Sequence, residues 1–574
     1  MWRDWRLFVP KTITVLRQGY GVGDFRSDLL AGLTVAIVAL PLSMALAIAS
    51  GAAPERGLIT AIVAGCLISL LGGSRFQVGG PTGAFVVVVY GVIAKHGYDG
   101  LLIASVIAGA VLVAAGLLRI GALIKYIPDP VTTGFTTGIA TIIFASQLKD
   151  IFGLTTAHVP ADFIPKMAAL WASRGSLSAP TLALASACFA AILLLRRYAP
   201  KVPGFLIITI VAAGAVYLLA LPVETIGSRF GGVASTLPAP SFGFWSWAKA
   251  HEVLPSAFTI ALLAGVESLL SAVVADQMTG RRHRSNMELV AQGLANIASA
   301  AFGGLPATGA IARTATNIRA GARSPIAGVA HAGFLLIFML ALGPLMKFVP
   351  LAALAAILVI VAMNMAELQR FGVLLRTSNG DRAVLLLTFG LTVLVDLTVA
   401  IEVGMVLAAF VFMHRMANLT SAVDGEAIVA DDEDDIAGGD RPAYQPNAGL
   451  AADVGVITFS GPLFFGSVST IKDTFDQIGA HKRAFILRFE GVPLIDPTGA
   501  YTLTRFLEGV LRKGATVVIC GARPTVAAAL PANLKTIGSG GLFFTPSFDR
   551  ARAIVQGDPM PTSAAGTTEG ATAP

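Results

Sequence analysis

The sequence predicts an α-helical membrane protein with about 14 transmembrane segments, followed by a small soluble α/β domain. Of its 574 residues, 55% are hydrophobic and only 13% are charged, whereas a typical soluble protein has about 25% charged residues. Apolar stretches recur from Leu29 to about Met416, and about 20 such residues cross the roughly 30 Å apolar core of a bilayer. From Asp453 onwards, short stretches rich in β-branched and aromatic residues indicate β-strands instead.

The apolar part divides into fourteen helical segments. In chain order they are residues 29–50, 57–72, 81–95, 100–118, 131–148, 180–197, 203–221, 254–276, 287–302, 309–320, 325–346, 351–365, 382–396 and 399–417. Loops that follow even-numbered segments carry more Lys and Arg than the other loops, which marks them as cytoplasmic. We therefore expect a protein of the cell (inner) membrane, with its N-terminus and its C-terminal domain in the cytoplasm.

Five parts follow one another along the expected chain. The soluble domain is expected to alternate strands at Gly455–Phe459, Ala484–Phe489 and Ala515–Ile519 with helices at Ser469–Ile478 and Ala500–Leu511. The parts are a basic N-terminal segment without a signal peptide (1–28), a transmembrane domain (29–417, with repeats 29–222 and 253–417), an acidic solvated linker (418–450), the α/β domain (451–557) and a disordered tail (558–574).

Several classes of function are excluded by what the chain lacks. Cys66, Cys188 and Cys520 are isolated and the 7 histidines do not cluster, so we expect no disulfide framework, metal site or cofactor. No Gly-Lys dipeptide occurs, which excludes a Walker-type loop and hence transport driven by ATP hydrolysis in this chain. The net charge of +7 lies in short loops and not in a nucleic-acid surface. No enzymatic activity is expected.

An internal repeat is the most informative feature. Gly79–Ala84 (GGPTGA) opens the third segment, and Gly303–Ala310 (GGLPATGA) opens the tenth, seven segments later. Because seven is odd, the two copies enter the membrane from opposite sides, as inverted repeats require. The apolar run Ala84–Ala94 is 11 residues, or roughly 16 Å of helix, which spans about half of the bilayer.

Two such half-helices would point their N-termini at each other near the middle of the membrane. Thr82 and Thr308 are expected to cap them, and each N-terminus carries roughly half a positive charge. Together they suit an anion of charge −1, and Arg313 extends the field to a dianion. The tenth segment, with Arg313, Asn317 and Arg319, is too polar to face lipid. The alternative is a helix break at a packing crossover, which one copy alone would favour.

Glu267 lies in the middle of the eighth segment, with Ser268 and Ser271 beside it on the helix. An ionised Glu267 about 6 Å from a bound anion would repel it by roughly 2.8 kcal/mol, or about two pK units, at an effective dielectric of 20. By linkage, the anion raises the affinity of Glu267 for a proton, which predicts proton–anion symport. The alternative is a buried ion pair with Arg313. Asp396 and Glu402 fall at segment ends and are interpreted as structural.

With these features in place, the chain resembles the SulP (sulfate permease) family of anion transporters, bacterial relatives of the solute carrier 26 family. The resemblance runs from about Asp24 to Gln556. The matching stretches are AGLTVAIVALPLSMALAIASG (31–51), GGSRFQVGGPTGAFVVVV (72–89), ESLLSAVVADQMTG (267–280), GLPATGAIARTATNIRAGARSP (304–325) and ILRFEGVPLIDPTGAYTL (486–503), the last of which resembles a STAS domain.

The resemblance implies a seven-plus-seven inverted repeat with core and gate domains, elevator-like movement and a homodimer. It also implies an anion held between segments one, three, eight and ten. With Glu267 as the proton-coupling residue, the expected substrate-binding residues are Leu42, Ser43, Thr82, Gly83, Ala84, Phe85, Ser268, Ser271, Thr308, Gly309, Ala310 and Arg313.

Two positions, Leu42 and Ile311, depart from the family pattern. Many relatives have Gln where this chain has Leu42, so one polar substrate contact is missing. Sodium-coupled bicarbonate members have a Thr where we align Ile311, which offers no oxygen to a sodium ion, so a proton is the expected coupling ion. In the STAS domain, Asp496 and Thr498 are expected to cap the helix from Ala500, and a regulatory phosphorylation site at Thr498 is the alternative.

The expected function is therefore secondary active, proton-coupled symport of a small anion, nominally sulfate. Bicarbonate, a C4-dicarboxylate such as fumarate or succinate, and an uncoupled channel or exchanger are alternatives. A nucleobase transporter of the same fold usually carries a second carboxylate near the tenth helix start, where this chain has Thr308-Gly309-Ala310. A further alternative makes the STAS domain a membrane-tethered module that binds a soluble regulatory partner.

Overall fold

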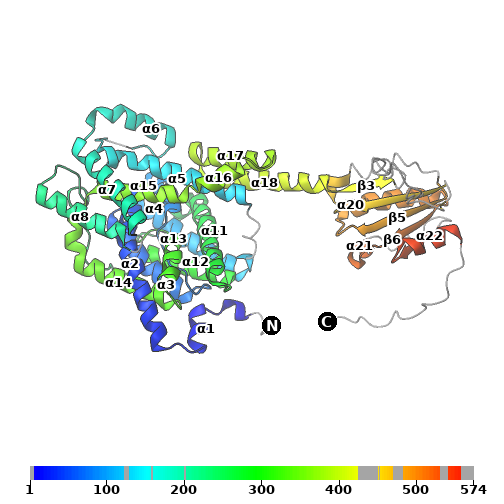
Figure 1. Cartoon of the computed structure of the whole chain (residues 1–574), viewed down its shortest axis with the longest axis horizontal. Coiled ribbons are helices and arrows are strands. Elements are labelled where there is room, and N and C mark those ends of the chain that lie inside the picture. The colour runs from blue at the N-terminus through cyan, green and yellow to red at the C-terminus, as the bar shows by residue number, and fades with distance from the viewer. Residues whose placement is uncertain are drawn as a thin grey trace. The chain divides into compact units, whose positions relative to one another are not determined.

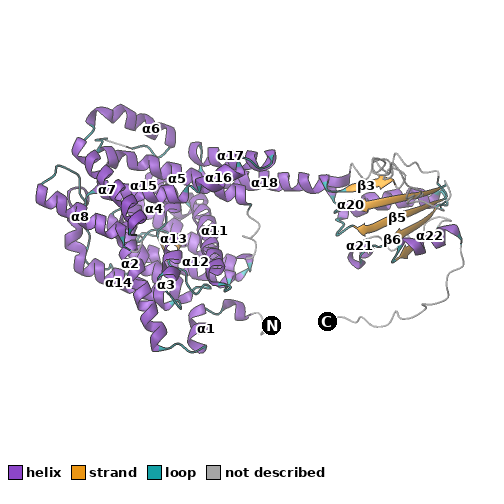
Figure 2. Ribbon diagram, viewed as in Figure 1, coloured by secondary structure: helices purple, strands orange, loops and turns teal. Residues whose placement is uncertain are grey.

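The computed structural model describes residues 5–121, 128–156, 159–199, 202–424, 450, 453–468, 482–529 and 541–557 (Figure 1). The chain divides into two compact units, Met1–Ala408 and Ala409–Pro574. Apart from one pair of two-residue strands, the described part of the first unit is helical, and the second unit holds a β-sheet (Figure 2). The expected combination of a helical membrane domain and an α/β domain is confirmed.

The long helices of the first unit match the expected segments closely. Five further short helices lie in the connections, at α1 (Lys11–Arg17), α6 (Phe163–Ala172), α9 (Ile226–Phe230), α10 (Trp247–Glu252) and α16 (Leu368–Leu374). The segments themselves are α2 (Val22–Ala49), α3 (Pro54–Leu71), α4 (Gly83–Leu117), α5 (Asp129–Phe152), α7 (Ala179–Tyr198), α8 (Gly204–Leu219), α11 (Leu254–Thr279), α12 (Ser285–Ala301), α13 (Ile311–Arg319), α14 (Ile326–Leu342), α15 (Leu351–Met365), α17 (Asn379–Leu394) and α18 (Leu397–Asn418).

Nine helices among the described residues are long and apolar enough to cross a membrane. The remaining expected segments are the second part of α4 and the shorter helices α8, α12, α13 and α17. The third and fourth segments are continuous in α4 except at Gly97, whose φ of 72° and ψ of 179° break the helix. A φ of this sign is accessible to glycine at little cost, so one residue suffices for the turn between the two segments.

Two groups of helices can be distinguished within the first unit, and they meet where α4 contacts α5 and α2 contacts α15. One group contains α2, α3, α4, α11, α12, α13 and α14, and the other contains α5, α7, α15 and α17. Small residues allow close approach in the first group. A Cβ on Gly57 would lie 2.0 Å from the carbonyl oxygen of Ser43, so α2 and α3 touch backbone to backbone at this point. These two groups correspond to the expected core and gate.

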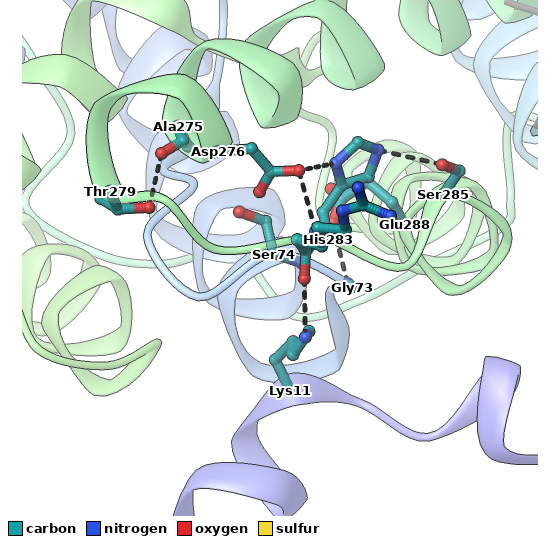
Figure 3. A network of polar contacts seen from close by, with 10 residues as sticks. Lys11, Gly73, Ser74, Ala275, Asp276, Thr279, His283, Ser285 and Glu288 are labelled. Atoms are coloured by element: carbon teal, nitrogen blue, oxygen red, sulfur yellow. Dashed lines mark hydrogen bonds and ion pairs between the residues drawn. The ribbon is translucent and has the colours of Figure 1, made fainter.

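A polar network joins α1 to the turn between α11 and α12 (Figure 3). His283 Nδ1 lies 2.7 Å from a carboxylate oxygen of Asp276, and its Nε2 lies 2.9 Å from the Ser285 hydroxyl. Lys11 Nζ donates to the carbonyl of Arg282 at 2.8 Å. Buried Glu288 accepts from the backbone N–H of Gly73 at 2.8 Å, which ties α12 to the end of α3. The basic turn between α11 and α12, which includes Arg282 and His283, is thus held in place by hydrogen bonds.

The second unit contains a five-stranded sheet in the order β3-β4-β5-β6-β7. Only β3 is antiparallel to its neighbour. Its strands are β3 (Ser421–Asp424), β4 (Val454–Ser460), β5 (Ala484–Gly491), β6 (Thr516–Cys520) and β7 (Leu542–Thr545). The expected strands are β4, β5 and β6. The sequence interpretation missed the two edge strands, and β3 falls inside the expected linker because four residues paired through their backbone leave little pattern in the sequence.

Each face of this sheet is covered by helices. One face of β4 and β5, with Phe459 and Phe485, packs against Leu503 and Leu507 of α20 (Pro497–Arg512). The opposite face packs against α22 (Phe548–Gln556) through Val555. A further helix, α21 (Pro524–Ala528), follows β6. The expected helix at 469–478 and the expected tail lie outside the described residues.

Close packing of α4 and α12 makes a stability test possible. A Cβ on Gly293 would lie 2.4 Å from the carbonyl oxygen of Gly109, whereas a Cβ on Gly91, also in α4, meets nothing within 4 Å. We expect Gly293→Ala to destabilise the protein by about 1–3 kcal/mol through overpacking, and Gly91→Ala to be neutral or to stabilise it by roughly 0.5–1 kcal/mol. Thermal unfolding of the purified variants in detergent measures both. Equal melting temperatures would show that α4 and α12 do not pack this closely.

Candidate functional site

The two glycine-containing breaks meet at a buried crossing of backbone. β1 (Gly79–Gly80) pairs antiparallel with β2 (Thr308–Gly309), with Gly79 opposite Gly309 and Gly80 opposite Thr308. The N–H of Ala310 donates to the carbonyl of Val78 at 2.9 Å and extends the pair. This finding confirms that the two halves of the repeat come together at their breaks.

Glycine is required at this crossing. Gly80 has a φ of +150°, which L-residues rarely adopt, and a Cβ there would lie 2.3 Å from an Arg313 nitrogen. A Cβ on Gly309 would collide with the side-chain nitrogen of Gln77 at 1.7 Å. A larger residue at either position would therefore displace the Arg313 or the Gln77 side chain from the crossing.

Two helices leave the crossing in opposite directions. α4 begins at Gly83, three residues after β1, and α13 begins at Ile311, two residues after β2. Because the strands are antiparallel, each helix presents its free N–H groups and the positive end of its dipole at the crossing. The expected arrangement of facing N-termini is present.

Thr82 occupies the expected N-cap position and Thr308 does not, and neither threonine caps its helix through its side chain. Thr82 occupies the N-cap position of α4, but its side chain makes no capping hydrogen bond. Its hydroxyl instead donates to a carboxylate oxygen of Glu267 at 2.9 Å. Thr308 lies in β2, the N-cap of α13 is Ala310, and the Thr308 hydroxyl donates to the carbonyl of Ala264 at 3.0 Å. In both cases, a partner on α11 displaces the local cap.

Glu267 of α11 therefore lies at the start of α4. Its side chain is half-buried, and Thr82 is the partner that holds it. Among the described residues, no ion pair joins it to Arg313, so the alternative of a buried Glu267–Arg313 pair is not what the structure has. The carboxylate is left available to take up or release a proton.

Arg313 is the charged centre of the site. Its side chain is 3% exposed, and its Nη2 donates to the Ser43 hydroxyl at 3.1 Å and to the Pro81 carbonyl at 3.2 Å. Both partners are neutral, and its Nη1 is buried without a hydrogen-bond partner in the described protein. A buried guanidinium with unused donors and no carboxylate partner is suited to an anion.

The other predicted residues fall into two groups. Leu42, Gly83, Ala84, Phe85, Gly309 and Ala310 are buried beside the crossing and supply apolar walls and backbone. Ser268 and Ser271 are also buried, but both hydroxyls are engaged elsewhere. Ser268 donates to the carbonyl of Gly265 at 3.1 Å, and Ser271 shares a 3.1 Å hydrogen bond with Thr314. Thr314 in turn accepts from the N–H of Val78 at 3.1 Å, so Ser271 supports the crossing from behind.

The sequence interpretation missed two buried polar side chains near the crossing. Gln77 and His331 have buried nitrogen or oxygen atoms without a partner in the described protein, as does Asn317, whose polarity the sequence had shown. His331, in the otherwise apolar α14, is fully buried. A histidine inside an apolar segment was the available signal, but nothing in its spacing pointed to this site. Among the described residues, no cluster of three or more His, Cys, Asp or Glu side chains could hold a metal ion.

In the second unit, the predicted Asp496 cap is present. Its carboxylate accepts from the Gly499 N–H at 2.7 Å and from the Phe465 N–H at 3.1 Å. The helix begins at Pro497 and not at Ala500, because proline suits the first helical position. Thr498 therefore lies inside the first turn, exposed and not capping.

Solved structures share this fold. Murine Solute Carrier 26 family member A9, described as an anion transporter in the inward-facing state, matches 97% of this chain and 95% of its own with a TM-score of 0.83 at 18% identity. The transmembrane domain of the cyanobacterial bicarbonate transporter BicA matches 68% of this chain and 98% of its own with a TM-score of 0.60 at 26% identity. The fold and its positive crossing define an integral membrane transporter of anions.

Sequence comparisons identify the family. Residues 25–388 match the Sulfate permease family and residues 445–533 match the STAS domain. YvdB of Bacillus subtilis (strain 168), whose name provisionally assigns it to sulfate transport, is 39% identical over 88% of this chain and 93% of its own. Bicarbonate transporter BicA of Picosynechococcus sp. is 30% identical over 87% of this chain and 89% of its own. The chain belongs to the sulfate permease family and carries a STAS domain.

The hydrogen bonds of Arg313 lead to a substitution test. We expect Arg313→Lys to lower anion uptake by at least tenfold, because all donors of an ammonium group diverge from one nitrogen, whereas Arg313 bonds Ser43 and Pro81 through Nη2 and keeps Nη1 for the anion. Arg319→Lys, at the exposed end of the same helix, is the matched control and should retain uptake. Uptake into proteoliposomes at equal protein content measures both. Full uptake by the Arg313 variant would show that the guanidinium does not contact the anion.

Proposed function

We propose that this protein carries a small oxyanion, nominally sulfate, together with a proton. The observation that carries the proposal is the meeting of Arg313, the α4 N-terminus and Glu267 at one crossing. Arg313 bonds the Pro81 carbonyl, and Glu267 bonds the hydroxyl of the next residue, Thr82. A fixed positive charge and a titratable negative charge thus lie on either side of a single peptide unit.

A charge count favours a dianion with a proton. The two helix N-termini contribute roughly one positive charge together, and Arg313 contributes another. With Glu267 protonated, the site therefore carries about two positive charges, which a sulfate dianion neutralises. With Glu267 ionised, about one positive charge remains, which suits a monoanion such as bicarbonate. Sulfate transport should then be tied to a proton, whereas bicarbonate transport need not be.

Coulomb's law gives the size of the proposed coupling between anion binding and proton binding. An anion about 6 Å from an ionised Glu267 is repelled by roughly 2.8 kcal/mol per unit charge product at an effective dielectric of 20. Binding of the anion and of the proton therefore favour each other by the same factor. Proton release on the side of low proton concentration would weaken anion binding there and release the cargo.

An elevator-like movement of the first helix group against the second would carry the site across the membrane. The side chains that hold the crossing, Ser43, Glu267 and Arg313, belong to α2, α11 and α13 of the first group, and the site meets the second group at Gly83, where an added Cβ would lie 2.6 Å from Met365 Sδ. The site can therefore move as one body while the group of α5, α7, α15 and α17 stays in place.

We further propose a homodimer in the cell (inner) membrane, with the N-terminus and the STAS domain in the cytoplasm, where the domain would meet a soluble regulatory partner.

Bicarbonate is the second candidate, because BicA is a 30% identical relative over most of both chains. A proteoliposome panel of sulfate, bicarbonate, fumarate, succinate and chloride, with and without an imposed pH difference, separates the candidates. Saturable sulfate uptake that is accelerated by an inward proton gradient is expected. Conductance without saturation would indicate a channel. Saturable bicarbonate uptake without a pH effect would favour transport of a monoanion without a proton.

Substitution of Glu267 tests the coupling directly. We expect Glu267→Gln to keep the hydrogen bond with Thr82 but to lose at least tenfold in gradient-driven sulfate accumulation, because the amide cannot exchange a proton. Sulfate exchange without a gradient should persist. Glu402→Gln, in another apolar helix and exposed, is the matched control. If the Glu267 variant still concentrated sulfate in response to a pH difference, Glu267 would not be the coupling residue.

A further inference from the structure

A cavity lies apart from the crossing of β1 and β2. It has a volume of about 400 Å³ and lies among α2, α4, α5, α6 and Arg229 of α9. None of the predicted binding residues lines it. Its walls include Tyr90, Lys149, Asp150, Thr156, Lys166 and Arg229.

Basic residues dominate the charge of this cavity. Lys149, Lys166 and Arg229 line it, against Asp150 as the single acid in the lining. Asp150 is taken by Arg229 at 3.1 Å, and Glu224 lies 3.9 Å from the same guanidinium. The positive charge that remains in the cavity is therefore that of the two lysines.

Lys166 is the unusual member of this set. Its side chain is 4% exposed, its Nζ lies 5.3 Å from the centre of the Tyr90 ring, and no carboxylate pairs with it among the described residues. Burial lowers the pKa of its amine, an effect that Asp162 partly opposes. The Tyr90 hydroxyl is fixed by the carbonyl of Val159 at 2.7 Å, so the ring is held in place beneath the ammonium group.

The burial of Lys166 is exceptional among the basic residues of the described chain. Lys166 and Arg313 are its only fully buried lysine or arginine side chains. The two fully buried acids, Asp28 and Glu288, each accept hydrogen bonds from backbone N–H groups. Since an unpaired buried charge is costly, a buried cation that faces the cavity and has no carboxylate partner of its own is matched by an anion that enters the cavity.

A neutral donor points the same way. Thr156 lines the cavity, and its hydroxyl is buried without a partner in the described protein. Buried hydroxyls are normally hydrogen-bonded, and an oxyanion accepts from a hydroxyl and from an ammonium group at once. Thr156 and Lys166 thus provide two unused donors of different kinds in one cavity.

We propose that this cavity is a second anion-binding site, which holds a small inorganic oxyanion such as sulfate through Lys166 and Thr156. The proposal rests on the transport of anions and is independent of proton coupling. The walls come from α2 and α4 on one side and from α5 and α6 on the other. The site therefore lies between the helix groups that an elevator movement would displace, and it would hold the anion on its way to or from the crossing.

Equilibrium binding of radiolabelled sulfate to the purified full-length protein in lipid nanodiscs tests this proposal. The unsubstituted protein should bind about two sulfates per chain, and Lys166→Met, which keeps the length and packing of the side chain, about one. Lys166→Arg keeps the charge and should restore the second site. Lys347→Met is the matched control, since Lys347 also lies over an aromatic ring, Phe348 at 5.0 Å, but is exposed and outside the cavity.

Combination with Arg313→Lys isolates the cavity. In that background, Lys166→Met should raise the remaining dissociation constant by at least tenfold, the effect of one charge-assisted hydrogen bond. Thr156→Val should raise it about threefold to tenfold without lowering the melting temperature, because the hydroxyl has no partner in the described protein to lose.

Three outcomes would overturn the proposal. They are one sulfate per chain in the unsubstituted protein, an unchanged stoichiometry in Lys166→Met, and a Thr156→Val variant that binds normally. If Lys166→Met does not fold, Thr156→Val decides alone. Loss of pH-driven uptake in Glu267→Gln has no bearing on these measurements, so failure of the coupling and failure of the cavity site can be told apart.

Discussion

The rest of the transport unit depends on the antiparallel contact between two strands of two residues each. This contact holds the breaks of both repeats at one point, and it works only because glycine at Gly80 and Gly309 lets the backbones and the Arg313 and Gln77 side chains approach. Both helix N-termini, the guanidinium and the Glu267 carboxylate take their positions from it. If the crossing were wider, the two helix N-termini, the Arg313 guanidinium and the Glu267 carboxylate would lie apart and would not form one site.

The choice of partners matters as much as the position. Arg313 is held by a hydroxyl and a carbonyl, so its orientation is fixed while its charge is not neutralised. A carboxylate in the same place would stabilise the empty protein and would also compete with the cargo. Glu267, held by Thr82, is likewise oriented by a neutral group and retains its capacity to exchange a proton.

Much of this arrangement was predictable from local sequence, and the rest was not. The repeated glycine-rich motif, the short helices and their opposite entry follow from spacing and hydrophobicity along the chain. The engagement of Thr82 and Thr308 by α11 does not, because a good N-cap residue takes a distant partner when packing offers one. His331 and Gln77 were missed because their burial depends on contacts between distant segments. Lys166 was missed because it resembles an ordinary basic residue of a connecting segment, and only the structure shows its burial against Tyr90.

Cations with and without carboxylate partners differ in their surroundings in this protein. Arg229 lies against Asp150 and Arg370 against Asp129, and these contacts join elements at positions that solvent reaches. Arg313 and Lys166 are buried without carboxylate partners in the described chain, Arg313 in α13 at the crossing and Lys166 in α6 at the cavity. A protein that binds anions only transiently needs such sites to be incompletely satisfied when empty. The same unmet charge that reduces the stability of the empty state is what makes binding of the anion favourable.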